Sequence, residues 1–497
     1  MIDIMAKYSL AALLWSVIFV SPAAAQTPLA LTLEQDPETE YLEEIREPSN
    51  PNALGLIELL DRSSNSVPKI LEARENINSR RARALAAEGA FDRQLSSLSR
   101  SRAAGFYGLT FIDNKLATPL RNIGGEVYGG YRISDGDFPV YEDEYVTLGF
   151  GELNFGASIA LLRDRQIDSR RMTLRDRAIE IEMAELDYVL ASIEVQHDAM
   201  IAYWNWVAAG QQLIIFRDLQ DLATNRTGAL STRIQEGDLA DIELVENQQR
   251  VFSRRERVIR AEQVLNNAAL ALSFYFRDKT GEPVVPGREL LPSGFPIPET
   301  ESRNLTSDVG AALDRQVELA LIDRRLELAS NRRALGRNEL LPQVDLEMKV
   351  ARDFGGGSVT RDETDLFVGF EVSVPLERRK AKGEIAAAEA DIRALEQRRK
   401  NISDQLIARI GQLANTIEAA QTSARLASGE LRLAERLEAA ERLRFREGAS
   451  SFFLLNQRED ARAEARLKQV NALALYQRAV TDYLAITADT TALRVRL

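Results

Sequence analysis

Residues 366–400 read LFVGFEVSVPLERRKAKGEIAAAEADIRALEQRRK, and they hold the two patterns on which the fold depends. Before Pro375 every second residue is apolar, which is the period of a β-strand with one apolar face. No proline follows Pro375, and the run from Lys380 to Glu447 has a helical pattern throughout. Such a helix is about 100 Å long, whereas globular helices average about 11–12 residues.

A second proline-free run extends from Arg163 to Glu236 and predicts a helix of about 110 Å. Apolar residues recur by sevens in both runs, which is coiled-coil spacing. Each run ends at a glycine, Gly237 or Gly448, where we expect a helical hairpin. Because a helix of this length cannot bury its apolar stripe in one compact core, the sequence predicts an extended, oligomeric architecture.

The two runs belong to an internal repeat. The interval between the hairpin glycines Gly237 and Gly448 is almost the same as the interval between the strand exits at Leu162 and Leu376. A nearly constant offset indicates one structural unit used twice. The predicted domains follow: a first repeat at 67–279 (strands about 95–162, long helix 163–236, hairpin near 237), an equatorial connector at 280–305, and a second repeat at 306–497 (strands about 343–375, long helix 380–447, hairpin near 448).

The lengths of the shorter helices predict how they line the long ones. The helices at 238–276 and 306–341, placed end to end, match the first long helix in length. The first helix, which begins at Val67, and the last one then pair along the second long helix. We expect two strands per repeat, with residues 106–145 forming an enlarged loop rich in Gly, Tyr and Asp.

Residues 1–25 have the features of a secretory signal peptide, because Lys7 precedes an apolar core and Ala23-Ala24-Ala25 offers a cleavage site. An N-terminal membrane anchor is the alternative, but the apolar run is shorter than the roughly 20 residues that span a bilayer. Residues 26–66 are acidic and rich in turn formers. We expect them to be an N-terminal segment that lies on the surface with partial order.

Composition excludes several classes of function. The net charge of −12 argues against a nucleic-acid partner. The chain has no cysteine and one histidine, and no nucleophile–base pattern is present, so we expect no enzyme activity, no cofactor and no metal site. His197 lies on a heptad seam and is expected to be a packed core residue. The aromatic cluster of Tyr203, Trp204 and Trp206 is likewise expected to serve packing.

No apolar stretch is long enough for a membrane-spanning helix, so a membrane-embedded form would have to use β-strands. Alternating strands of about ten residues are typical of transmembrane β-barrels. Four strands cannot close a barrel, but three chains would supply twelve, with a lumen lined by Asp345, Glu347 and Glu371. The predicted fold class is mainly α with a small β part: a duplicated strand–helix hairpin repeat, assembled as a trimer with a hollow helical cylinder joined to a 12-stranded β-barrel.

Four segments carry a resemblance to a known family: LLPQVDL at 340–346, VSVPL at 372–376, and the two hairpins RIQEG at 233–237 and RFREG at 444–448. Because strands, long helix and hairpin follow one another in the same order twice, after a signal peptide, the chain resembles the TolC-like outer membrane factor (outer membrane efflux protein) family over residues 67–497. The resemblance implies a homotrimeric channel of a Gram-negative envelope, in which a trimeric α-barrel tunnel is joined to a 12-stranded outer-membrane β-barrel. It also implies that residues 26–66 are an N-terminal periplasmic segment. Such channels are passive exit ducts of tripartite efflux pumps or type I secretion systems.

The resemblance also implies partners and sites. The partners are a periplasmic adaptor (membrane fusion) protein, an inner-membrane transporter of RND, ABC or MFS type, and outer-membrane lipid. The adaptor would dock at the helical tips, which also form the gate. The matching tip residues are Arg233, Gln235, Glu236, Gly237, Asp238, Arg444, Phe445, Glu447, Gly448 and Ser450.

The gate departs from the family pattern. Glu243 matches an acidic gate position in the first repeat, but Leu454 and Gln457 stand where the second repeat usually has aspartates. Phe445 replaces a usual tyrosine and Ser450 a usual arginine. The usual aspartate ring and Tyr–Arg–Asp latch are therefore absent in that form. The candidate gate residues are Glu243, Gln457, Glu459 and Asp460.

A periplasmic adaptor or a coiled-coil scaffolding protein of an envelope complex is the alternative. An adaptor carries one helical hairpin, whereas this chain has two, each preceded by alternating strands. A scaffold made only of coiled coil would have no strands. A lumen lined by acids favours cations, but it does not distinguish drugs, metals, oligosaccharides or a secreted polypeptide as the substrate.

Overall fold

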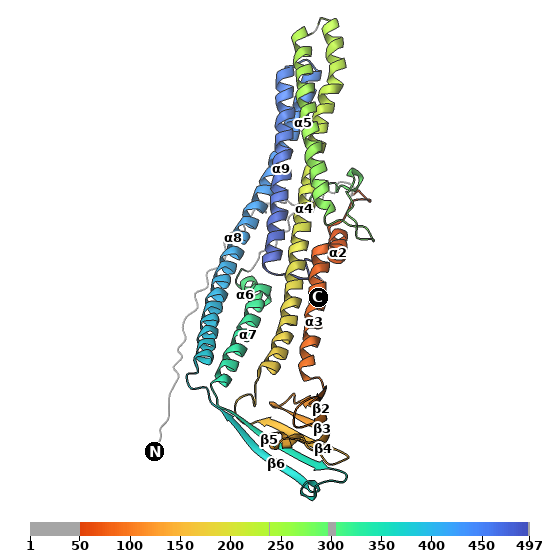
Figure 1. The fold of residues 1–497 in the computed structure, drawn as a ribbon. Helices are drawn as coiled ribbons and strands as arrows, with labels where there is room; N and C mark the ends of the chain where they lie inside the picture. Colours follow the sequence, from red (N-terminus) through yellow and green to blue (C-terminus); the bar gives the residue numbers. More distant parts are fainter. Residues whose placement is uncertain (1–49, 238, 297–304, 496–497) are drawn as a thin grey trace, which may run out of the picture. The chain divides into compact units, whose positions relative to one another are not determined.

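The computed structural model describes residues 50–237, 239–296 and 305–495, which belong to one compact unit beginning at Asn50. This unit is mostly helical and has one small antiparallel sheet (Figure 1). Within the described residues, no helix is both long and apolar enough to cross a membrane. The predicted signal peptide lies outside the described residues.

The sheet has six strands in the order β1-β2-β3-β4-β5-β6, and every neighbouring pair is antiparallel. The strands are β1 (Gln94–Ser101), β2 (Leu109–Pro119), β3 (Gly125–Gly136), β4 (Glu152–Ala160), β5 (Gln343–Asp353) and β6 (Thr364–Ser373). The expectation of two strands per repeat is therefore wrong for the first repeat, which has four. Most of the predicted loop at 106–145 is β2 and β3. These strands are stabilised by pairing with their neighbours along their length, and the residue pattern of a single strand does not reveal that pairing.

Two long helices follow the strands of the two repeats: α4 (Ser169–Gln235, 67 residues) and α8 (Arg379–Arg446, 68 residues). Each is followed by an antiparallel partner, α5 (Asp241–Ser273) or α9 (Phe452–Ile486). The shorter helices are α2 (Leu56–Ser66), α3 (Pro68–Glu88), α6 (Leu305–Arg315) and α7 (Val317–Glu339). The single helix expected at 306–341 is divided by Gln316, whose backbone is extended.

α4 begins at Ser169, later than the strand-exit pattern predicts, because its start is fixed by a side-chain cap. The Asp168 carboxylate accepts a hydrogen bond from the backbone N–H of Arg171 at 2.8 Å. The Arg171 guanidinium returns to the same carboxylate at 2.8 Å and also donates to the carbonyls of Asn122 (3.1 Å) and Arg165 (3.0 Å). This buried arginine thus joins the start of α4 to the turn between β2 and β3.

The pairing of the shorter helices differs from the prediction. α3 and α5 pack along α4, whereas α7 and α9 pack along α8, and α7 and α9 also contact α4 (Figure 1). The reason is that the strands of each repeat return the chain to the place where it entered the sheet. The helix before the strands therefore lies beside the long helix that follows them in the same repeat.

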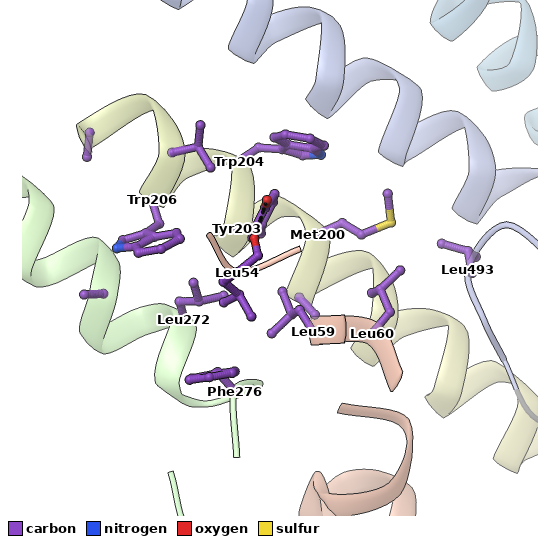
Figure 2. Packing of buried hydrophobic residues seen from close by; sticks show 14 of the residues in the cluster. Leu54, Leu59, Leu60, Met200, Tyr203, Trp204, Trp206, Leu272, Phe276 and Leu493 are labelled. Carbon is purple, nitrogen blue, oxygen red and sulfur yellow. Dashed lines mark hydrogen bonds between the residues drawn. The ribbon is translucent and has the colours of Figure 1, made fainter. Parts of the chain in front are cut away.

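The largest core lies where α2 and α5 meet the middle of α4 (Figure 2). Trp206 is 1% exposed and packs among apolar residues of α5, while Leu59 of α2 is 0% exposed. The Tyr203 hydroxyl donates to the carbonyl of Leu54 at 2.9 Å, and the Gln196 amide donates to that of Leu60 at 2.9 Å. The described part of 26–66 therefore contains a helix whose inner face is packed in the core, which the expectation of a partly ordered surface segment did not include. Its prolines lie before the helix and conceal it in the sequence.

Truncating Leu59 tests whether α2 belongs to this core. We expect Leu59→Ala to reduce the free energy of unfolding by about 2–5 kcal/mol, because it removes a buried leucine side chain and leaves a cavity. The matched control is Leu85→Ala on α3, whose side chain is 71% exposed and should change stability by about 0.5 kcal/mol or less. Thermal unfolding followed by circular dichroism gives both values. Equal stabilities of the two variants would show that α2 does not pack on α4.

Candidate functional site

The helical hairpins end at two glycines with left-handed backbone conformations. Gly237 has φ +85° and Gly448 has φ +75°, and each amide closes a turn by donating to a carbonyl three residues earlier. A side chain at either position would strain the backbone, although open space surrounds both. Each glycine therefore lies just after the end of a long helix, where the chain reverses direction.

Contacts between aromatic and arginine side chains link the two hairpins near these turns. The Arg233 guanidinium of α4 lies 5.6 Å from the centre of the Phe445 ring of α8. Phe445 in turn lies 6.3 Å from Phe452 of α9, and Arg226 of α4 lies 5.6 Å from the Phe452 ring. Cations over aromatic faces are attracted by the ring quadrupole. The structure thus brings the predicted tip residues Arg233 and Phe445 together.

The other predicted docking residues are mostly on the surface. Gln235, Glu236, Arg444 and Glu447 are exposed or partly exposed, whereas Ser450 is partly buried and donates a hydrogen bond to the Glu441 carboxylate. Asp238 lies outside the described residues. The tips therefore present accessible polar side chains around two tight turns, and their role in docking stays a prediction.

Behind the tips, charged side chains, some of them buried, connect α4, α5 and α9. We call the set the tip charge network; its members are Arg226, Arg250, Arg254, Asn456, Glu459 and Asp460. Glu459 is 0% exposed and pairs with Arg226 and with Arg254, the latter at 3.3 Å. Asp460 pairs with Arg254 at 3.1 Å and with Arg250 at 3.2 Å. Arg226 also donates to the Asn456 side chain at 2.9 Å.

Removing one partner of a buried ion pair typically costs about 3–5 kcal/mol, because the other charge stays buried without compensation. The packing of the second hairpin on the first one therefore depends on every charged member of the network being present. Of the predicted gate residues, Glu459 and Asp460 belong to it. Sequence reasoning missed the arginines, since arginines are common on solvated helix faces and the acidic partners of these arginines lie in the other repeat.

The remaining gate candidates lie outside this network. Glu243 is in the first turn of α5, where burial, and then the charge of Glu246, raise the pKa of its carboxyl group. Gln457 is exposed on α9. The structure thus separates the four candidates into a paired set, Glu459 and Asp460, and two individual side chains.

The sheet has one polar face, on which the predicted lumen residues lie together. Asp345 of β5 is opposite Glu371 of β6, and Glu347 is opposite Gly369, so the three acids share one face. The same face carries ion pairs that the sequence did not reveal. They are Lys115–Glu126 (3.0 Å), Arg132–Asp113 (2.8 Å) and Lys349–Glu152 (3.2 Å). Two of these pairs join β2 to β3, in the region predicted to be loop.

The segment between β3 and β4 folds over this polar face at the end far from the helices. The Tyr145 ring stacks on Phe111 of β2 with ring centres 4.4 Å apart. Arg132 donates to the Glu144 carbonyl at 2.6 Å, and the Asp353 carboxylate accepts from the Leu148 amide at 3.0 Å. Residues 137–151 therefore cover part of this polar face.

Comparison with known proteins identifies the fold. No family model matches the sequence, and no curated protein matches it. Solved structures do match. The Campylobacter jejuni CmeC outer membrane channel aligns with a TM-score of 0.62 and 13% identity, over 87% of this chain and 85% of that one. The chain has the fold of these outer membrane channels. The resemblance to TolC-like outer membrane factors is thus confirmed at the level of the fold.

Two further solved structures of outer membrane proteins give the same result. The outer membrane protein VceC of Vibrio cholerae has a TM-score of 0.60 and 13% identity, over 87% of this chain and 96% of that one. The open state of the Neisseria gonorrhoeae MtrE outer membrane channel has a TM-score of 0.60 and 12% identity, over 87% of this chain and 88% of that one. The outer membrane channel fold therefore covers nearly the whole described chain.

Within this channel fold, His197 links the two repeats and is not the packed core residue that its heptad position predicts. Its ring nitrogens lie 2.8 Å from the Asp482 carboxylate on α9 and 2.9 Å from that of Asp198. Burial lowers the pKa of His197, but the hydrogen bonds and charges of Asp482 and Asp198 outweigh it, and the net pKa is raised above 6.5. Among the described residues, no group of three or more His, Asp or Glu is placed to hold a metal ion.

The His197 contacts predict a pH-dependent stability. Because the folded pKa is raised, the stabilisation is complete below the unfolded value of 6.5 and is lost as pH rises through the folded pKa. We expect His197→Gln to lower the thermal unfolding midpoint more at about pH 5.5 than at about pH 9. The control Asp482→Asn should show the same trend, since it removes the partner. A deficit that is independent of pH would exclude this charge contact between α4 and α9.

Proposed function

We propose that the chain forms a homotrimeric channel in the outer membrane of a Gram-negative bacterium. It would act as the passive exit duct of a tripartite efflux pump or a type I secretion system. The observation that carries this proposal is the outer membrane channel fold, which covers 87% of the chain in the CmeC comparison. The proposed assembly is a helical tunnel joined to a β-barrel that the copies share.

Exposed apolar stripes support the trimer. On α5, Val245, Phe252 and Ile259 recur by sevens and are 57%, 73% and 58% exposed. On α8, Leu426 and Leu433 are also seven apart and are 71% and 61% exposed. Large exposed apolar side chains at heptad spacing indicate a further helix partner. Neighbouring copies of α5 and α8 would cover them when the helices close a cylinder.

The tip charge network supports a gate at the helical tips. We infer that it holds the α8–α9 hairpin against the α4–α5 hairpin in the closed channel, and that opening breaks its ion pairs. The network would then keep the channel closed in place of the family's usual latch, whose aspartate positions are occupied here by Leu454 and Gln457. Asp460 is the more accessible acid of the network, with a side chain 38% exposed, so it can be changed with less effect on folding than Glu459.

Conductance measurements in planar bilayers test the gate. We expect Asp460→Asn to raise the resting conductance severalfold, because it removes the contacts to Arg250 and Arg254. Arg250→Gln should act in the same direction, and the double variant should add little, since both changes break the same link. Glu243→Gln serves as the comparison outside the network. If only Glu243→Gln opens the channel, the gate lies at the start of α5. Wild-type protein that never conducts would refute the channel itself and favour a scaffold.

The exposed tips support docking of a periplasmic adaptor, which would connect the duct to an inner-membrane transporter of RND, ABC or MFS type. Glu447 lies at the exposed end of α8, beside Gly448. Glu396 is exposed on the same helix far from the tip and provides a matched position.

Photo-crosslinking in cells tests this docking. We expect a probe at Glu447 to capture an adaptor protein, identified by mass spectrometry, whereas a probe at Glu396 should not. Equal capture at both positions, or capture only of other copies of the chain at Glu447, would contradict docking at the tips. The chain should also fractionate with the outer membrane as an integral trimer; recovery as a soluble periplasmic protein would favour the adaptor or scaffold alternative.

A further inference from the structure

The sheet ends in two strands that have one neighbour each. Within the described residues, β1 pairs only with β2, and β6 pairs only with β5. An unpaired edge leaves a row of backbone donors and acceptors without partners, which is prohibitive in a lipid environment. β1 leads away from α3 and β6 leads toward α8, so the two edges run in opposite directions. They have the polarity of antiparallel neighbours.

The additional strands of the first repeat are built firmly into the sheet. β1 pairs along its whole length, from Gln94 opposite Ala117 to Ser101 opposite Thr110. β2 and β3 are joined by a continuous ladder and by two ion pairs on the polar face. Their turn is held to the start of α4, where the Gly124 amide donates to the Arg165 carbonyl at 3.4 Å. The pair β1–β2 therefore continues the wall and does not branch from it.

We propose that β6 of one copy pairs with β1 of the next copy, so that three copies close a barrel of 18 strands and not 12. This inference rests on the trimer under "Proposed function". The occupant of each sheet edge is thus a second copy of the same chain. The polar face would line the lumen, and the face with Leu366, Val368 and Phe370 would meet lipid.

The registers of the sheet define how the closure would work. One row perpendicular to the strands connects Asp365, Ala351, Asn154, Gly130, Lys115 and Ser96. When β1 of one copy lies antiparallel beside β6 of the next, with the ends nearest the helices aligned, Ser96 is opposite Glu371. This pairing keeps polar residues on one face. Ser96 is thus in the row of Asp365 within its own chain but opposite Glu371 in the neighbouring copy. The perpendicular row is therefore displaced along β6, from Asp365 to Glu371, each time it passes through one chain.

This shift is consistent with a closed barrel. Each chain contributes six strands and a shift of six positions, so the stagger around the barrel averages one position per strand. With about 3.3 Å per residue and about 4.8 Å between strands, the strands tilt by about 35°. Transmembrane barrels have tilts of about 35–45°. At equal tilt, an 18-stranded barrel is about 1.5 times as wide as a 12-stranded one. Residues 137–151, which lie over the polar face, would fill part of this added width.

Disulfide trapping tests the closure directly, because the chain has no cysteine of its own. The variant Ser96→Cys/Glu371→Cys should give covalently linked dimers and trimers after mild oxidation of membranes, seen on denaturing gels. Within one chain the two positions are five strands apart, about 24 Å across the sheet, and lie in rows six residues apart, so an intrachain bond cannot form. Each single-cysteine variant should remain monomeric on the gel. Placing the second cysteine at Gly369 or Ser373 in place of Glu371 detects a register two residues away.

A second pair of cysteines tests the alternative, a 12-stranded barrel. In a 12-stranded barrel, β1 and β2 would leave the wall and β6 would meet β3, bringing Glu371 near Tyr128. Crosslinking of Tyr128→Cys/Glu371→Cys between chains, with none for the Ser96 pairs, would overturn the 18-stranded barrel. So would the absence of all these crosslinks in an intact trimer. The native mass of the reduced protein separates the two proposals: a monomer would refute the trimer, whereas an intact trimer without the Ser96 crosslinks would refute only the closure.

Discussion

The backbone ladder between β4 and β5 is the interaction on which the rest of the structure depends. It is the place where the two repeats enter one sheet, with residue pairs from Glu152–Asp353 to Ala160–Asp345. Because β4 leads into α4 and β5 follows α7, the ladder sets those two helices beside each other. The contacts of α4 with α7 and α9 then extend this alignment along the coiled coils. Backbone hydrogen bonds thus give the two repeats a common direction.

The sequence predicted the features that repeat over many residues and missed those that depend on one cross-strand contact. The long helices follow from the absence of proline and from heptads, and the strands of the second repeat follow from strict alternation. In the first repeat, glycines interrupt that alternation. Tyr128 is paired with Gly156, and a Cβ on that glycine would lie 2.3 Å from the tyrosine ring. The ring fills the gap only once the strands are paired, so no single strand shows the pattern.

The candidate site divides in the same way. Gly237 and Gly448 could be found from the sequence because a reversal after a long helix requires residues that tolerate a left-handed backbone. The tip charge network could not, because Arg226 and Arg254 lie on α4 and α5 while their partners lie on α9. Their burial is a property of three helices packed together. The helix α2 was missed for a similar reason, since Leu54 and Leu59 acquire a core only against α4.

The turn between β2 and β3 has a consequence for how such a protein can change. It lies at the helical end of the sheet and returns the chain to the next strand without entering a helix. A whole hairpin can therefore be inserted or deleted there while every connection between strands and helices is kept. The circumference of the strand wall and the number of helices are then independent variables. Gain or loss of one hairpin in a gene would change the bore of an assembly in a discrete step and leave its helical machinery unaltered.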